Sequence, residues 1–345
     1  MREPLRPIEW TGNAVRVIDQ TELPGRLVRM SLESVEQLVD AIQRLAVRGA
    51  PQLGAVGALG VVIAMDQCAR EGWSPAELDA AIAHIRAARP TAVNLAWGVD
   101  RVSPLISSGR QAVLAAALDI VEQDERINRA IGRHGADWVQ ARVPGRVRVL
   151  THCNTGALAT TAWGTALGVI RELHARGALE VVFVDETRPL LQGARLTAWE
   201  LVQDGIPHYV QADGAAASTI LRGLVDVAII GADRIAANGD TANKIGSVGV
   251  ALACADAGIP FIVAAPESTV DVRTASGADI EIEMRDGAEV LTWGGVRVAP
   301  EGTRAHNPAF DVTPARLVTA LVTEEGVLEV SAGQLPGDRL SSGVR

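Results

Sequence analysis

Cysteine is scarce in this chain of 345 residues. The three cysteines, Cys68, Cys153 and Cys254, show no Cys-x-x-Cys spacing, so the sequence predicts neither a disulfide framework nor a zinc site. Cys68 and Cys254 lie in apolar helical patterns, where a cysteine usually packs as a small hydrophobic residue. Cys153 differs from both, because polar residues surround it.

Positive charge and long apolar runs are also lacking. The formal net charge of −9 argues against nucleic acid or an anionic membrane surface as the main partner. The longest apolar stretch, 53–65, has 13 residues, well short of the roughly 20 that span a bilayer. The N-terminus carries no apolar signal-peptide core. We therefore expect a soluble, cytoplasmic protein.

The fingerprints of nucleotide-binding loops are absent as well. No predicted strand is followed by Gly-x-Gly-x-x-Gly, and no Gly-x-x-x-x-Gly-Lys-Ser/Thr occurs. After the strand pattern at 225–230, Asp233 stands where a second glycine would approach a pyrophosphate. Gly54, Gly57 and Gly60 lie within a helical pattern, where they favour close helix packing. A nicotinamide-dependent dehydrogenase is therefore disfavoured.

The length predicts two domains, and the patterning changes near residue 145. Residues 1–144 are predicted to form a small α-rich domain with short β-strands. Ser34 and Gln37 form a capping box that opens one helix, and Pro51 suits the first turn of the next. Further helical patterns cover 76–88, 94–106 and 111–140.

Residues 145–330 alternate between strand and helix patterns. This alternation predicts an α/β, Rossmann-like domain with a mostly parallel sheet, whose ligands bind at the carboxyl ends of the strands. Residues 331–345, rich in Gly, Ser and Pro, are predicted to form a flexible tail. The strand patterns lie at 147–150, 181–184, 208–210, 225–230 and 260–264, and the helical patterns include 157–176 and 195–203.

Cys153 lies in the hexapeptide Thr-His-Cys-Asn-Thr-Gly, between a strand pattern and a helical pattern that begins near Ala157. In that setting the positive end of the helix dipole would stabilise a thiolate and could hold a phosphate. His152 is adjacent, but neighbouring residues on an extended segment point in opposite directions. A structural hydrogen bond is therefore favoured for His152 over a Cys–His dyad.

A second strand end, at 185–195, presents Arg188 and Gln192, which can hydrogen-bond a polyol or a phosphate. For Arg188 taken alone, an ion pair with Asp185 or Glu186 is the favoured alternative.

A third strand end carries Asp233 at the same edge of the predicted sheet as Cys153. The next helix is expected to begin near Asn243 and Lys244, which would place an amide and a cation close to its N-terminus. That arrangement favours binding of an anion.

Six ordered segments carry a resemblance to known proteins. They include Arg-Gly-Ala-Pro and Asn-Pro-Ala-Phe-Asp, and they lie at 48–51, 89–95, 151–156, 186–201, 231–247 and 307–311. Together they closely resemble the methylthioribose-1-phosphate isomerase family, which belongs to the superfamily of the regulatory subunits of eukaryotic initiation factor 2B. The resemblance runs from about residue 5 to residue 325.

The resemblance implies conversion of 5-methylthio-ribose 1-phosphate to 5-methylthio-ribulose 1-phosphate in methionine salvage. It implies a homodimer without a cofactor, and an α-rich N-terminal domain before a Rossmann-like domain. It also implies that Cys153 and Asp233 are the catalytic pair. The implied substrate-binding positions are Arg48, Gly49, Ala50, Arg89, Gln192, Asn243 and Lys244.

Such a substrate needs assisted ring opening, because a phosphate on C1 blocks the spontaneous reaction. A protonated Asp233 in an apolar surround could give O4 its proton. Hydrogen then moves from C2 to C1, either through an enediol with a Cys153 thiolate as base or as a direct hydride shift. A thiol with an ordinary pKa of about 8.5 is mostly neutral at pH 7. The first route therefore needs a lowered pKa, and the small apolar residues at 156–163 favour the second.

Two positions depart from the family pattern. Gln52-Leu53 replaces a more familiar Ala-Ile, and Thr155 replaces a common Ala, so either change could adjust the pocket for the 5-substituent. Isomerisation of 5-deoxyribose 1-phosphate or ribose 1,5-bisphosphate is one alternative. A non-catalytic, sugar-phosphate-sensing regulatory subunit is another, but it has no need for both Cys153 and Asp233.

Overall fold

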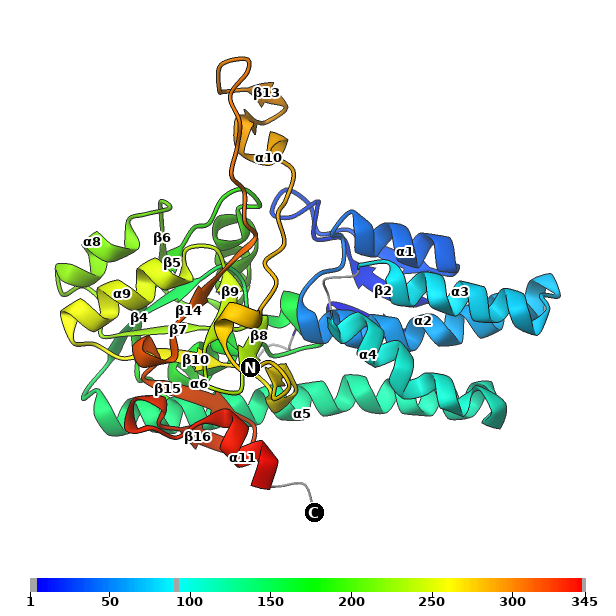
Figure 1. Cartoon of the computed structure of the whole chain (residues 1–345), viewed down its shortest axis with the longest axis horizontal. Coiled ribbons are helices and arrows are strands. Elements are labelled where there is room, and N and C mark those ends of the chain that lie inside the picture. Colours follow the sequence, from blue (N-terminus) through cyan, green and yellow to red (C-terminus); the bar gives the residue numbers. More distant parts are fainter. Residues whose placement is uncertain (1–4, 90–92, 343–345) are drawn as a thin grey trace. The chain divides into compact units, whose positions relative to one another are not determined.

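The computed structural model describes residues 5–89 and 93–342 (Figure 1). The chain forms two compact units, of which unit 1 contains Met1–Ile127 and Thr155–Gly164, and unit 2 contains Asn128–Asn154 and Thr165–Arg345. The division differs from the predicted domain boundary in two ways. It falls within a continuous helix, α5 (Arg110–Arg142), and it assigns the segment after Asn154 to unit 1. The reason is that the division follows packing, whereas the sequence shows only where the pattern changes.

Unit 1 is mostly helical, as predicted. Its first helix has Ser34 as N-cap, whose side chain accepts from the backbone N–H of Gln37, and Pro51 lies in the first turn of the next helix. The elements are β1 (Ile8–Trp10), β2 (Val15–Ile18), β3 (Arg29–Leu32), α1 (Val35–Gln43), α2 (Ala50–Glu71), α3 (Pro75–Ala87), α4 (Val93–Val102), η1 (Ser103–Ser108), α5 and the 3₁₀ turn η2 (Ala157–Ala159).

Helix α2 is the centre of the apolar core of unit 1. Its glycines allow α4 to approach closely, because a Cβ added at Gly98 of α4 would lie 2.0 Å from the carbonyl oxygen of Gly54. In the described part of the chain, α2 is long and apolar enough to cross a membrane, but 78% of its apolar window is buried within the protein. A core helix of a globular protein has these properties.

Unit 2 contains the C-terminal part of α5 and, apart from Thr155–Gly164, the chain that follows it. Its further elements are β4 (Val147–His152), α6 (Ala166–Ala175), β5 (Leu179–Asp185), the π-helical turn η3 (Gly193–Thr197), α7 (Ala198–Asp204), β6 (His208–Gln211), α8 (Ala216–Leu221), β7 (Val227–Ile230), β8 (Arg234–Ala236), β9 (Thr241–Lys244), α9 (Ser247–Ala257), β10 (Phe261–Ala264), η4 (Glu267–Thr269), β11 (Val270–Asp271), η5 (Gly277–Asp279), α10 (Ala288–Leu291), β12 (Thr292–Trp293), β13 (Val296–Arg297), β14 (Phe310–Thr313), η6 (Ala315–Leu317), β15 (Ala320–Thr323), β16 (Gly326–Leu328), η7 (Val330–Ala332) and α11 (Pro336–Ser342).

The main sheet of unit 2 has the order β16-β15-β10-β7-β4-β5-β6, and only the edge strand β16 is antiparallel to its neighbour. From β4 the chain adds strands in one direction, to β5 and β6, and from β7 in the other, to β10 and β15. Because crossovers between parallel strands are right-handed, this reversal places α6 and α7 on one face and α9 on the other. Figure 1 shows α8 beside α9. The predicted fold class is confirmed.

A smaller sheet, in the order β11-β8-β9-β14, lies within the same unit. Figure 1 also shows an arm, labelled α10 and β13, that extends away from the main sheet. The segment predicted as a flexible tail differs from that expectation, because it contains η7 and α11. Gly337 N donates to the carbonyl of Ala237 at 3.0 Å, and Arg339 pairs with Glu267 at 3.2 Å.

Candidate active site

Cys153 follows the last residue of β4 and is buried, with an exposed fraction of 5%. Its Sγ donates to Gln192 Oε1 at 2.9 Å, an arrangement that stabilises the neutral thiol. The prediction of a helix beginning near Ala157 was wrong, because the chain forms the short turn η2 there and α6 begins only at Ala166. The dipole of a long helix therefore does not start at this turn.

The backbone of Cys153 has a φ of 63°, a conformation that costs a non-glycine residue about 1–3 kcal/mol and persists where the surroundings hold it. Thr197 Oγ1 donates to the carbonyl of Cys153 at 2.6 Å. Asn154 Nδ2 donates to Thr197 Oγ1 at 3.1 Å and to Glu200 Oε1 at 2.9 Å. The turn is thus tied to a buried carboxylate.

That carboxylate is paired in turn with Arg171, at 2.8 Å. Both side chains are buried. Burial alone would lower the pKa of Arg171, but Glu200 and Asp204 raise it. The buried Arg171–Glu200 pair therefore supports the turn that carries the thiol, because Glu200 accepts from Asn154, the residue after Cys153.

The loop after β5 is organised by Glu186. Its carboxylate accepts from the backbone N–H groups of Thr187 at 2.8 Å and of Gly193 and Ala194 at 3.0 Å each. Burial raises the pKa of Glu186, and these three donors oppose the shift. The loop closes around this side chain and so directs Gln192 to Cys153.

Arg188 does not form the predicted ion pair with Asp185 or Glu186. Its Nη2 donates to the carbonyl of Val290 at 3.1 Å, and its guanidinium lies 5.3 Å from the ring centroid of Trp293. Arg188 thus fastens the base of the arm to the loop that carries Gln192, because the arm offers an acceptor and an aromatic face. Local sequence could not show this contact, since the partners lie about a hundred residues further on.

Asp233 follows β7, the neighbour of β4 in the sheet. The strand order reverses between these two strands, and such a reversal opens a crevice for ligands at their carboxyl ends. Asp233 N donates to the carbonyl of Ala242 at 2.9 Å, and the residue is exposed. Burial within unit 2 does not supply the apolar surround that a protonated Asp233 needs.

Asn243 and Lys244 lie on β9, and a helix begins near them, as predicted. The helix α9 begins at Ser247, to which Asn243 Nδ2 donates at 2.9 Å. Lys244 Nζ donates to the carbonyl of Ala309 at 3.1 Å and lies 4.3 Å from the ring centroid of Phe310. Pairing of β9 with β14 places Phe310 opposite Lys244.

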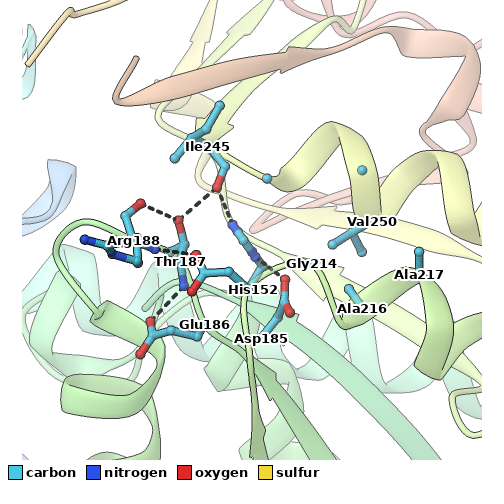
Figure 2. A pocket seen from close by; sticks show the side chains of 13 residues that line it. His152, Asp185, Glu186, Thr187, Arg188, Gly214, Ala216, Ala217, Ile245 and Val250 are labelled. Atoms are coloured by element: carbon cyan, nitrogen blue, oxygen red, sulfur yellow. Dashed lines mark hydrogen bonds and ion pairs between the residues drawn. The ribbon is translucent and has the colours of Figure 1, made fainter. Parts of the chain in front are cut away.

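His152 has both ring nitrogens bonded. Nδ1 lies 2.7 Å from Asp185 Oδ2, and Nε2 lies 2.8 Å from the carbonyl oxygen of Ile245. These bonds leave neither nitrogen for a Cys–His dyad, in agreement with the structural role that the sequence favoured. A cavity of about 360 Å³ lies beside the ring, between the ends of β4 and β5, the loop after β6 and the start of α9 (Figure 2).

The remaining predicted binding residues lie in unit 1. Arg48 is buried, and its Nε donates to Gln20 Oε1 at 3.1 Å. Gly49 is the N-cap of α2, and no side chain caps this helix end. Ala50 is the first residue of α2, so its N–H belongs to the group that can bind an anion. Arg89 follows α3, and its neighbours 90–92 lie outside the described residues.

The structure therefore groups the predicted residues by unit. Unit 2 brings Cys153 to Gln192, and it places Asp233 on the strand next to that of Cys153. Asn243 and Lys244 share one strand. Unit 1 holds the segment 48–50 and Arg89. Within residues 5–89 and 93–342, no group of three or more His, Cys, Asp and Glu side chains could hold a metal ion.

Three residues that shape these groups were not identified from the sequence: Gln20, Thr197 and Glu200. The contacts of Thr197 and Glu200 with the Cys153 turn join residues more than 40 positions apart, and no local pattern marks such pairs. For Glu200 a signal existed, because it is a carboxylate inside an apolar helical pattern. Gln20 lies outside every segment of the resemblance.

Comparisons with known proteins agree on one family. The model of the "Initiation factor 2 subunit family" matches residues 46–330. A probable bifunctional methylthioribose-1-phosphate isomerase/methylthioribulose-1-phosphate dehydratase of Nocardia farcinica is 53% identical over 99% of this chain, which spans 63% of that relative. A methylthioribose-1-phosphate isomerase of Gloeobacter violaceus is 49% identical, with 95% of this chain and 94% of the relative covered.

Two further similarities bear on the substrate and the fold. A 5-deoxyribose 1-phosphate isomerase of Moorella thermoacetica is 50% identical, with 95% of each chain covered. The crystal structure of 5-methylthioribose 1-phosphate isomerase from Pyrococcus horikoshii matches with a TM-score of 0.88 and 37% identity, over 99% of this chain and 96% of that chain.

Proposed function

The chain belongs to the initiation factor 2 subunit family, and we propose that it converts 5-methylthio-ribose 1-phosphate to 5-methylthio-ribulose 1-phosphate in methionine salvage. The names of the relatives from Nocardia and Gloeobacter support this substrate. The observation that carries the proposal is the placement of Cys153 and Asp233 after the neighbouring strands β4 and β7, where the strand order reverses. A subunit that only binds sugar phosphates does not need both groups.

In this proposal Asp233 gives O4 of the sugar its proton when the C1–O4 bond breaks. The Asp233 carboxylate then takes the proton of the 2-hydroxyl as hydride leaves C2 and C2 becomes the carbonyl carbon. The neutral thiol of Cys153, held by Gln192, suits a direct transfer of hydride from C2 to C1. The route through an enediol instead needs a thiolate at the same position. Residues 157–162 are buried, which supports the dry surroundings that a hydride shift favours.

The uncapped start of α2, with Arg48, Gly49 and Ala50, is proposed to bind the phosphate of the substrate, and Lys244 is a further proposed substrate ligand. A helix N-terminus combines N–H donors with the positive end of the dipole. The other proposed substrate ligands are Arg89, Gln192 and Asn243.

We propose a cytoplasmic homodimer that needs no cofactor and has no nucleic-acid or membrane partner. The net charge of −9 supports the absence of a polyanionic partner. Large apolar side chains on β6, α8 and α9, namely Tyr209, Leu221 and Leu252, have exposed fractions of 64%, 55% and 51% and support contact with another protein surface. Light scattering of the purified chain tests the dimer directly.

Turnover without added cofactor tests the function. We expect 5-methylthio-ribose 1-phosphate to be preferred over 5-deoxyribose 1-phosphate and ribose 1,5-bisphosphate. The relative from Moorella is the reason to include the deoxy sugar, since a pocket for one small apolar group discriminates by only about 10–200-fold. Absence of turnover on all three sugars would refute an isomerase.

Reaction in deuterated water separates the two routes. A direct hydride shift leaves C1 of the product free of solvent deuterium. Deuterium at C1 in full stoichiometry would exclude the shift and require a base at Cys153.

A further inference from the structure

His152 connects two strand ends that carry proposed site residues. Its own strand, β4, leads directly into Cys153. Its ring forms a hydrogen bond with the carbonyl of Ile245, which directly follows Lys244, the last residue of β9. Thr187 Oγ1 donates to the same carbonyl at 3.0 Å. Figure 2 shows His152 and Thr187 meeting at this oxygen.

The backbone at Gly246 fits closely against the ring. A Cβ at this position would lie 2.8 Å from His152 Cε1, and the φ of Gly246 is 106°. Only glycine therefore permits this approach without displacement. The imidazole fills the space between the Cys153 strand and the chain that follows Lys244.

Both hydrogen-bond partners of the ring are acceptors. A backbone carbonyl only accepts, so Nε2 carries a proton. The other oxygen of Asp185 accepts from Gln211 Nε2 at 3.1 Å. An Asp185 carboxylate on this side of the ring calls for a second ring proton, on Nδ1. A proton on each ring nitrogen, which is the imidazolium form, satisfies both partners.

The charged groups around the ring are consistent with this state. Burial alone would lower the pKa of His152, but Asp185 on β5, the Ile245 carbonyl and Asp311 on β14 together raise it above its ordinary value of 6.5. Asp311 itself accepts from the backbone N–H of Gly246 at 2.8 Å.

Three other charged residues line the adjacent cavity: Glu186, Arg188 and Asp213. The carboxylate of Glu186 accepts from backbone N–H groups of its own loop. Asp213 accepts from the backbone N–H of Arg188 at 2.5 Å, while the guanidinium of Arg188 donates to the arm. The charge on His152 is therefore balanced by Asp185 and Asp311.

We propose that His152 is a positioning residue, held as an imidazolium, that fixes Lys244 relative to Cys153. The inference rests on the proposed function, because it treats these two residues as substrate ligand and catalytic thiol. When the ring loses one proton, the remaining proton stays on Nδ1 beside the Asp185 carboxylate. The bond from Nε2 to the carbonyl of Ile245 then breaks and the end of β9 is released. Substrate binding should then weaken more than the chemical step.

Two near-isosteric variants separate the two bonds. His152→Gln places its amide nitrogen near Nε2 and keeps the bond to Ile245, whereas His152→Asn places it near Nδ1 and keeps the bond to Asp185. We expect the KM of His152→Asn to rise about tenfold, the loss of one charge-assisted hydrogen bond, with a smaller change in kcat. His152→Gln should stay within about threefold of wild type.

The pH profile is the readout that a merely structural role would not change. The KM of the wild-type enzyme should rise as the pH increases above 6.5 through the raised pKa of His152, and the KM of both variants should lack this rise. Equal KM values in the two variants, or the wild-type profile in either, would overturn the inference.

Nitrogen NMR of the wild-type protein, labelled with ¹⁵N in its six histidines, tests the protonation state without turnover. We expect one ring to keep protons on both nitrogens above pH 6.5, and its signals to disappear in His152→Gln. If neither variant folds, the wild-type spectrum alone tests the inference. An unprotonated nitrogen in each of the six histidine rings would overturn it. If the wild-type protein turns over none of the three sugars, the proposed function is refuted, whatever the NMR spectrum shows.

Discussion

The two groups of proposed substrate-binding residues are held by different kinds of interaction. In unit 1, neutral amides hold Arg48: Gln20 accepts from its Nε at 3.1 Å, and the amide groups of Gln20 and Gln52 lie 2.9 Å apart. In unit 2, buried charges hold the Cys153 turn and the end of β9. Amides do not titrate, whereas a buried histidine does, so the two regions should respond differently to pH.

The location of each group explains this difference. The segment 48–50 begins a core helix, and the groups that support it are a side-chain amide and the carbonyl of Leu158, to which Gln20 Nε2 donates at 2.7 Å. The unit 2 residues follow strands of a sheet whose ends meet in a polar crevice. Carboxylates gather there, and each one that is buried needs a cation or several N–H donors.

The largest expected effect comes from the proposed catalytic pair. Cys153→Ser and Asp233→Asn should each lower kcat by about 10²–10⁴-fold, the range for loss of a group that transfers protons or stabilises the transition state, while the sugar phosphate still binds. Steady-state kinetics and calorimetric binding measure both quantities. Cys68→Ser is the matched control and should keep wild-type turnover, because Cys68 packs away from the site with its Sγ 3.6 Å from the carbonyl of Trp73. Equal turnover in all three variants would remove Cys153 and Asp233 from the mechanism.

The buried ion pair behind Cys153 should contribute most to stability. Arg171→Leu leaves Glu200 as an uncompensated buried charge and should lower the free energy of unfolding by about 3–5 kcal/mol. Denaturant unfolding followed by circular dichroism measures the loss.

The control for Arg171 is an exposed pair. Arg126 lies 3.6 Å from Glu122, with side chains 61% and 73% exposed, so Arg126→Ala should cost about 0–1 kcal/mol. A cost for Arg171→Leu as small as that of the control would show that the charge pair does not hold the turn.

In unit 1 the start of α2 depends on a close backbone approach. A Cβ at Gly49 would lie 2.3 Å from the carbonyl oxygen of Ala159, and the φ of Gly49 is 93°. Gly49→Ala should therefore lower the free energy of unfolding by more than left-handed backbone strain alone, which costs about 1–2 kcal/mol. It should also raise KM, because Arg48 and Ala50 move with the displaced backbone. Gly72→Ala is the comparison, with a φ of 74° and nothing within 4 Å, and should cost only the strain. Similar costs in the two variants would contradict the close approach.

A variant at Gln52 sharpens the contrast between the regions. Gln52→Ala, which restores the residue more familiar in the family, removes the fully buried partner of Gln20 and should cost about 1–3 kcal/mol. Its effect on KM should be the same at pH 6 and pH 9, because the side-chain amide that is removed does not titrate. The exposed Gln111 supplies the control Gln111→Ala, with an effect within about 0.5 kcal/mol.

The same contrast applies to stability against pH. Since the folded-state pKa of His152 is raised above 6.5, its contribution to the stability of unit 2 is fully present below that pH. The contribution is lost as the pH rises through the folded-state value. Wild-type protein should therefore lose stability relative to His152→Gln on going from pH 6 to pH 9, and parallel curves for the two proteins would contradict the charged state of the ring.

The alternation of strands and helices was predictable from the sequence, because period and turn residues are local properties. The strand patterns from 147 to 264 correspond to β4, β5, β6, β7 and β10. The predicted helix at 157 failed for a reason of long-range packing. Its small apolar residues satisfy a helical pattern, but Ala159 lies against Gly49, about a hundred positions earlier.

The candidate site was predictable only in part. Cys153, Asp233 and the proposed ligands were identified from their positions at strand ends and from the family resemblance. Their roles stay predictions until the variants are measured. The partners that hold them, such as Thr197 and Asp185, were outside the reach of spacing arguments. Each of these bonds joins residues that are neighbours only after the sheet has formed.

The sequence by itself determined the fold class, the family and the strand ends at which polar residues gather, because these follow from local periodicity and from long ordered motifs. Tertiary structure alone decided that His152 faces two acceptors, that Lys244 lies on a strand, and that a buried Arg171–Glu200 pair supports the thiol turn. A hydrogen bond or a buried charge depends on distances of a few ångströms between remote segments. Packing of the whole unit sets those distances, and no stretch of sequence encodes them alone.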